Sequence, residues 1–310
     1  NDFGSVQLNT MGGNDEVSVK STHAGTTELN TNAGNDTVTL ETVSGNTTVN
    51  TAAGSDTVNI RTISGNTTVN TGADADTVNV GSLAPATGGN VNGIGAVLTV
   101  NGDGEADSLN VDDTGDTAGN TGNLTATDIT GLGMTGKIVY GTVEALTIGL
   151  GSGDDTFTVE STQTGTTALN TNAGNDTVTL ETISGNSTVN TAAGSDTVNI
   201  RTIAAATTVN TGADADTVNV GSLAPATGGD VNGIGAVLTV NGDGEADSLN
   251  VDDTGDTAGN TGNLTATDIT GLGMTGKIVY GTVEALTIGL GSGDDTFTVE
   301  STHAGTTELN

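Results

Sequence analysis

The sequence contains no cysteine and no tryptophan, two prolines, and aromatic residues at only 2% of its 310 positions. The absence of cysteine excludes a disulfide scaffold, a thiolate metal site and a cysteine nucleophile. The scarcity of aromatic residues excludes a core built on large ring side chains. The sequence also lacks a run of about 18 apolar residues, so it predicts no membrane-spanning helix and no insertion into a membrane.

Positive charge is scarce as well. Five lysines and arginines stand against 38 aspartates and glutamates, which gives a net charge of −33 and excludes nucleic acid as a partner. A hydrophobic content of 33% with this charge is also found in disordered acidic linkers. The apolar residues are not scattered, however, since they alternate with threonine and asparagine, as in Thr37-Val38-Thr39-Leu40. This alternation of β-branched residues favours short strands, and no helical periodicity occurs.

A long outer repeat organises the chain. Segments 31–170 and 171–310 differ at nine positions, and residues 21–30 recur as residues 301–310. We therefore interpret 1–30 as the end of a preceding unit, followed by two full units of one continuous solenoid. The chain reads as a window from a longer repeat protein.

A shorter inner repeat, with a period of about 20 residues, lies within each unit. One copy reads as a strand over 37–42, a turn over 44–46, a second strand over 47–51 and a return turn over 52–56. Strand and turn at this period, without helix, are typical of a solenoid. The predicted fold class is all-β, a right-handed parallel β-helix or β-solenoid with one inner repeat per coil and with loop insertions.

Stacking of the coils predicts rows of identical side chains. Val38 is expected to lie in register with Val58 in the core. Asn30, Asn50 and Asn70 are expected to stack and to form hydrogen bonds along their row. Much of the stability should come from such ladders, because the core is thin.

Two insertions break the inner rhythm in each unit. Residues 82–96 and 112–136 are expected to leave the solenoid as loops, because residues that cannot stack are tolerated at its side. Periodicity leaves open whether 108–154 forms a further coil or a side hairpin. Loops on a rigid scaffold often carry contacts, and the rare basic residues Lys137 and Lys277 are candidates for pairing with a neighbouring copy.

Stacked coils also place aspartates in a ladder. Asp36, Asp56 and Asp76 would lie about 5 Å apart and repel one another. Raised pKa values, local capping of turn amides or bound cations could each relieve the repulsion. Hard oxygen ligands suit Ca²⁺, so calcium is the favoured expectation and local capping is the alternative.

The turns Gly34-Asn35-Asp36 and Gly54-Ser55-Asp56 resemble the second half of the nonapeptide of the repeats-in-toxin (RTX) proteins. The resemblance implies parallel coils with Ca²⁺ held in Gly-x-Asp turns, although Asn32-Ala33 replaces the leading glycines of the motif. The candidate metal ligands are Asp15, Asp36, Asp56, Asp74, Asp76, Asp107, Asp154, Asp155, Asp176, Asp196, Asp214, Asp216, Asp247, Asp294 and Asp295.

The chain also resembles repeat regions of very large secreted or surface-displayed bacterial proteins. This resemblance implies an extracellular or cell-surface location and a mechanical role as stalk, fibre or filament. The expected partners are copies of the chain and, as a further option, cell-surface polysaccharide.

Catalysis is not expected. His23 and His303 are one repeat position in a loop, and the pairs Asp112-Asp113 and Asp154-Asp155 recur among glycine and threonine. Two alternatives stay open: a β-helix that binds or cleaves polysaccharide, and an ice-binding solenoid, since outward threonine rows resemble the Thr-x-Thr faces of that class.

Overall fold

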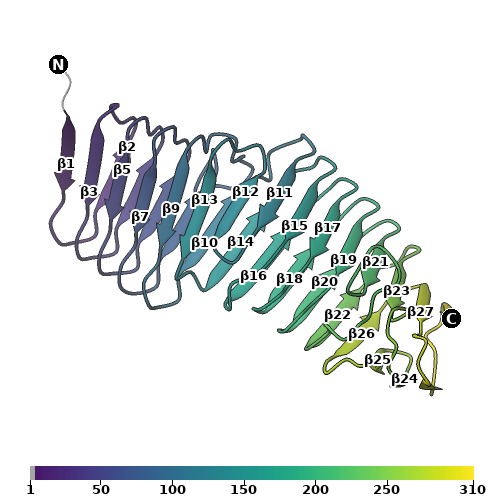
Figure 1. Cartoon of the computed structure of the whole chain (residues 1–310). Helices are drawn as coiled ribbons and strands as arrows, with labels where there is room; N and C mark the ends of the chain where they lie inside the picture. Colours follow the sequence, from purple (N-terminus) through teal and green to yellow (C-terminus); the bar gives the residue numbers. More distant parts are fainter. Residues whose placement is uncertain (1–3) are drawn as a thin grey trace. The chain divides into compact units, whose positions relative to one another are not determined.

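The structure is a computed structural model that describes residues 4–310. These residues form strands, turns and bends and no helix, so this part of the chain holds no helix that could cross a membrane. The chain divides into two compact units, which meet in sequence between Gly151 and Ser152. Each unit consists of two facing sheets between which the chain passes back and forth (Figure 1).

In the first unit, one sheet has the order β1-β3-β5-β7-β9-β13-β12-β11 and the other the order β2-β4-β6-β8-β10-β14. Its strands are β1 (Ser5–Asn9), β2 (Glu16–Val19), β3 (Thr26–Asn30), β4 (Thr37–Leu40), β5 (Thr47–Asn50), β6 (Thr57–Ile60), β7 (Thr67–Asn70), β8 (Thr77–Val80), β9 (Val97–Asn101), β10 (Ser108–Asp112), β11 (Thr121–Leu124), β12 (Asp128–Gly131), β13 (Lys137–Gly141) and β14 (Ala145–Gly149).

In the second unit, the orders are β15-β17-β19-β21-β23-β27-β29 and β16-β18-β20-β22-β26-β25-β24-β28. Its strands are β15 (Thr156–Val159), β16 (Thr166–Asn170), β17 (Thr177–Leu180), β18 (Ser187–Asn190), β19 (Thr197–Ile200), β20 (Thr207–Asn210), β21 (Thr217–Val220), β22 (Val237–Asn241), β23 (Ser248–Asp252), β24 (Thr261–Leu264), β25 (Asp268–Gly271), β26 (Lys277–Gly281), β27 (Ala285–Gly289), β28 (Thr296–Val299) and β29 (Thr306–Leu309).

The predicted coil is confirmed. Strand β4 pairs in parallel with β6, and Val38 lies opposite Val58, its equivalent in the next inner repeat. Side chains alternate across the strand, so Val38 and Leu40 are buried between the sheets while Thr37 and Thr39 face outward. Rows of valine, leucine and isoleucine fill the core of each unit, and the predicted all-β, largely parallel solenoid is the observed fold.

Glycine shapes the corners where one coil rests on the next. Gly34 and Gly54 have φ angles of 132° and 122°, a region that side chains rarely enter. A Cβ atom on Gly54 would lie 2.2 Å from the carbonyl oxygen of Gly34. The Gly-x-Asp turn therefore needs glycine for both backbone conformation and the close approach of neighbouring coils.

Residues 112–136 do not project as a loop, which corrects the expectation from spacing. They contain the antiparallel pair β11 and β12, and β12 also pairs antiparallel with β13, so all three lie within one sheet. Leu124 and Ile129 are fully buried and explain why the hairpin stays in the sheet. Segment 108–154 thus contains both a hairpin and further coil strands.

Residues 82–96 are also only partly exposed. Leu83 is 50% exposed, whereas Val91 and Ile94 are fully buried. Ile94 forms an isolated parallel bridge with Ile63, which belongs to the corner of the preceding coil. The insertion therefore contributes side chains to the core and others to the surface.

The two sheets exchange roles along the repeat. Residues 5–9 and 145–149 are equivalent repeat positions, yet β1 and β14 lie in different sheets of the first unit. In the second unit, β16 and β29 are equivalent and likewise lie in different sheets. Because three consecutive strands, such as β11 to β13, stay in one sheet, the chain crosses between the two sheets an odd number of times in each outer repeat. A strand and its equivalent one outer repeat later therefore lie in opposite sheets.

Candidate functional site: the inner aspartate row

The aspartates that precede the strands form a buried row in each unit. Each side chain lies at the corner where the return turn enters the next strand, and its exposed fraction is between 1% and 3%. We call this set the inner aspartate row. Its members are Asp36, Asp56, Asp76 and Asp107 in the first unit, and Asp155, Asp176, Asp196, Asp216 and Asp247 in the second unit.

In both units, carboxyl oxygens of the row cap the preceding coil. Oδ1 of Asp56 accepts a hydrogen bond of 2.7 Å from the backbone N–H of Asp36, and Oδ1 of Asp76 accepts one of the same length from Asp56. The second unit repeats the pattern, since Asp196 and Asp216 bind the amides of the aspartates before them at 2.7 Å. The row therefore links coil to coil, whereas the capping alternative placed these bonds within one turn.

The second carboxyl oxygen, Oδ2, lacks such a bond in most members of the row. Oδ2 is buried and has no hydrogen-bond partner in Asp36, Asp56, Asp76, Asp176, Asp196 and Asp216. An unsatisfied buried acceptor is costly, and a charged one more so. Each of these carboxyl groups thus keeps one oxygen in an environment that disfavours a negative charge.

The pKa values follow this environment. Burial, with the negative charges of Asp56 and Asp107, raises the pKa of Asp76 to about 6, although the Asp56 amide and the Thr71 hydroxyl act to lower it. Burial likewise raises the pKa of Asp196 to about 7 and that of Asp216 to about 6. Desolvation of the charged form is the leading cause in every case.

Other predicted ligands lie outside the row. Asp15 is half-buried and donates its amide to Asp36, while Asp74 is exposed and accepts a hydrogen bond from the Gly54 amide. Asp154, Asp214 and Asp294 are exposed, and Asp295, half-buried, accepts a 2.8 Å bond from the Asn260 amide.

The row does not fit a calcium site. Ca²⁺ requires six to eight oxygen ligands around one point. Within residues 4–310, no group of three or more histidine, cysteine, aspartate or glutamate side chains could hold a metal ion. In Asp56, Asp76, Asp196 and Asp216, one carboxyl oxygen is occupied by an amide and the other is enclosed in the core. Calcium binding by the chain stays a prediction, based on the resemblance to RTX turns.

A second pair of buried acids was not among the predicted ligands. Asp113 and Asp253, each 1% exposed, follow β10 and β23 and accept hydrogen bonds from the amides of Val91 and Val231. Burial raises the pKa of Asp253 to about 6. These acids fasten the insertion to the coil. The sequence singled out Asp112-Asp113 only as a carboxylate pair, and strand periodicity gives no signal for the burial of its second member.

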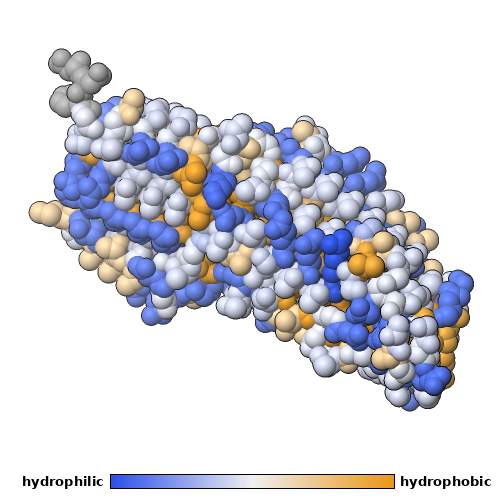
Figure 2. Space-filling view, in the orientation of Figure 1, coloured by the Kyte–Doolittle hydropathy of each residue, from blue (hydrophilic) through white to orange (hydrophobic). Residues whose placement is uncertain are grey.

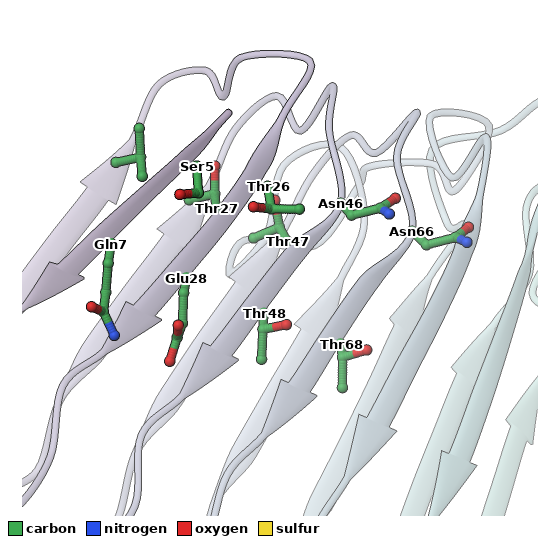
Figure 3. Close-up of a pocket in the computed structure, with 11 residues that line it drawn as sticks. Ser5, Gln7, Thr26, Thr27, Glu28, Asn46, Thr47, Thr48, Asn66 and Thr68 are labelled. Atoms are coloured by element: carbon green, nitrogen blue, oxygen red, sulfur yellow. The ribbon is translucent and has the colours of Figure 1, made fainter. Parts of the chain in front are cut away.

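The outer face of the first unit carries a shallow polar groove of about 620 Å³ over β1, β3, β5 and β7. Gln7, Glu28, Thr48 and Thr68 form one line across it (Figure 3), and Figure 2 shows hydrophilic side chains in rows on this face. No aromatic or basic side chain lines the groove. It offers hydrogen-bonding groups without a nucleophile and base in contact.

The basic side chains bind acids of the same unit. Lys137 lies 2.6 Å from Asp128, and Lys277 lies 2.7 Å from Asp268, so each lysine joins β12 to β13 or β25 to β26. Their predicted pairing with a neighbouring copy stays a prediction. His303 contacts the ring of Tyr280 edge-on at 5.8 Å, which fits a packing role.

Comparison with known proteins adds no family: no family model matches the chain, and no curated protein matches it. The class that the geometry defines is a repetitive, mostly parallel β-solenoid with acids buried between its coils.

Proposed function

We propose that the chain is a non-enzymatic structural β-solenoid that extends or assembles at a cell surface or outside the cell. The observation that carries the proposal is that many polar groups of the chain form hydrogen bonds between neighbouring coils. Backbone ladders, asparagine rows and the inner aspartate row all bind from coil to coil. The buried aspartates and the stacked asparagines thus hold the coils together.

The repetition supports the same role. The two outer repeat units are nearly identical and form the same strands with the same register, as in β4 with β6 and β17 with β19. A function that depends on length and regularity needs such copies, whereas a catalytic site needs only one. Small polar side chains on the outer faces suit contacts with other copies of the chain or with a surface polysaccharide.

Deletion of residues 31–170 tests the proposal. The deletion joins Asn30 to Thr171, whose repeat equivalents Asn170 and Thr31 already flank such a junction. We expect a folded, shorter protein with an unchanged strand signal in circular dichroism and a smaller hydrodynamic radius. Unfolding of the shortened chain, or cleavage of polysaccharides by the intact chain, would contradict the structural role.

A further inference from the structure

The hydrogen-bond donors around the inner aspartate row can be counted. The Thr51 hydroxyl lies beside the Asp56 carboxyl group, and its proton would lower the pKa of that group if it were donated to the carboxylate. Its single proton is committed to the carbonyl oxygen of Thr71 at 2.6 Å. A hydroxyl has one donor and two acceptor positions, so Thr51 can still accept. While this proton is held by the Thr71 carbonyl oxygen, Oδ2 of Asp56 has an acceptor beside it and no hydrogen-bond partner.

The threonine hydroxyls of the second unit form the same hydrogen bonds. Thr191 lies beside Asp196 and donates to the carbonyl oxygen of Thr211 at 2.5 Å. Thr171, beside Asp176, donates to the carbonyl oxygen of Thr191 at 3.2 Å. Because the arrangement recurs along each unit, it is a property of the repeat and not of one position.

No positive charge faces the row in the described chain. All five lysines and arginines have acidic partners elsewhere, namely Glu41, Asp128, Glu181 and Asp268. The charged groups that face the central members are acids: Asp36 and Asp74 for Asp56, Asp56 and Asp107 for Asp76, Asp176 and Asp216 for Asp196, and Asp214 and Asp247 for Asp216.

We propose that the inner aspartate row binds protons in place of metal ions, so that in mildly acidic solution its central carboxyl groups are neutral and join neighbouring coils as both acceptors and donors. Oδ1 accepts from the amide of the preceding coil, and a proton on Oδ2 is donated to the adjacent threonine hydroxyl. This satisfies the buried oxygen and removes the repulsion within the row. The row differs from the expected calcium site because the carboxyl oxygens that a metal ion would need are buried.

The proposal sets the direction of a pH response. The pKa values of Asp76, Asp196 and Asp216 are raised from 3.8 to about 6, about 7 and about 6. Between the unfolded and the folded pKa, the folded chain holds more protons than the unfolded chain, so stability falls as pH rises. The stabilisation is fully present below about pH 3.8 and is lost as pH passes through about 6 to 7.

The test compares melting temperatures of the full chain at about pH 5 and about pH 8, in high salt to screen the general charge. The double variants are Asp56→Asn with Asp76→Asn, and Asp196→Asn with Asp216→Asn. Asparagine keeps the acceptor and replaces the protonated oxygen by a permanent donor. We expect the wild type to melt several degrees lower at the higher pH. The variants should lose most of this difference and be the more stable proteins at about pH 8.

The matched control is Glu105→Gln with Glu245→Gln, since both glutamates are exposed and their loss removes the same charge. The control should keep the pH response of the wild type. Equal responses in the control and the asparagine variants would overturn the proposal. Melting temperatures of the asparagine variants that are lower at both pH values would show that the charged form is needed, and would overturn it too.

Two measurements on the wild type need no variant. Unfolding in a weakly buffered solution at about pH 5.5 should release protons, because the folded chain binds more of them. An unchanged or rising solution pH on unfolding would contradict the proposal. Addition of Ca²⁺ at about pH 8 should leave the melting temperature unchanged. A large rise in the wild type that is absent in the asparagine variants would assign the row to metal instead.

Discussion

The side-chain amide of Asn50 donates a hydrogen bond of 2.7 Å to the side-chain oxygen of Asn30, one coil earlier in the same sheet. Asn70 donates to Asn50 in the same way, also at 2.7 Å. Every bond of this row runs in one direction, so each inner asparagine both donates and accepts. Such chains of hydrogen bonds polarise one another, which strengthens contacts that are individually modest.

Substitution of Asn50 by alanine removes one donated and one accepted bond from the middle of this row. At about 1 kcal/mol for each bond, we expect the free energy of unfolding to fall by about 2 kcal/mol. Urea denaturation followed by circular dichroism measures the change. Thr48→Ala, on the same outer face of β5, is the matched control and should cost less. Equal losses would mean that the asparagine row contributes no more than strand propensity.

Glycine at the corner gives a second prediction. Gly54→Ala should destabilise the chain by more than about 1 kcal/mol, because the positive φ and the 2.2 Å approach to the Gly34 oxygen both oppose a side chain. Gly104→Ala is the control, since nothing lies within 4 Å of its Cβ position. Thermal melting of both variants decides the matter. A Gly54 variant as stable as the Gly104 variant would refute the close packing of the corners.

The coil could be predicted from the sequence because its signals are local and repeated. Alternation identified strands such as 37–40, the inner period placed Val38 opposite Val58, and equal spacing placed Asn50 beside Asn30. A one-residue slip would turn every apolar side chain outward, so the register had little freedom. Stacking of Asp36, Asp56 and Asp76 was predictable for the same reason.

The hairpin of β11 and β12 could not be predicted. Its apolar residues, such as Leu124 and Ile129, alternate like those of any coil strand, and nothing in that pattern distinguishes antiparallel from parallel pairing. The exchange of sheets from one outer repeat to the next depends on this hairpin and was invisible for that reason. The burial of the aspartates was missed because a turn position is ordinarily assigned to the surface.

Arg61 gives a prediction about the insertion 82–96. Its Nε donates a 2.9 Å bond to the carbonyl oxygen of Ala84, and its guanidinium lies 3.5 Å from Glu41. Arg61→Gln should loosen the insertion while the coil stays intact, because the half-exposed ion pair itself contributes little. Faster proteolysis near Ala84 with an unchanged melting temperature is the expected result. Arg201, which binds Ala224 at 3.0 Å, provides the same test in the second unit. Unchanged proteolysis in both variants would show that other contacts hold the insertion.

Ile60 and Ile200 allow the independence of the two units to be measured. Both are fully buried, and they pair with different neighbours: Ile60 with Leu40 and Val80, Ile200 with Leu180 and Val220. Either substitution by alanine leaves a cavity and should cost about 2–5 kcal/mol, whereas Val6→Ala, at a position that is 44% exposed, should cost much less.

The double variant Ile60→Ala with Ile200→Ala should lose the sum of the two single losses, within about 0.5 kcal/mol, because their strands pair with no strand in common. Denaturant titration of the two single variants and the double variant measures the coupling. Additivity is what a stack of coils with nearest-neighbour contacts requires. A double loss far from the sum would show that a defect in one coil is transmitted along the repeat, and the nearest-neighbour description would then be wrong.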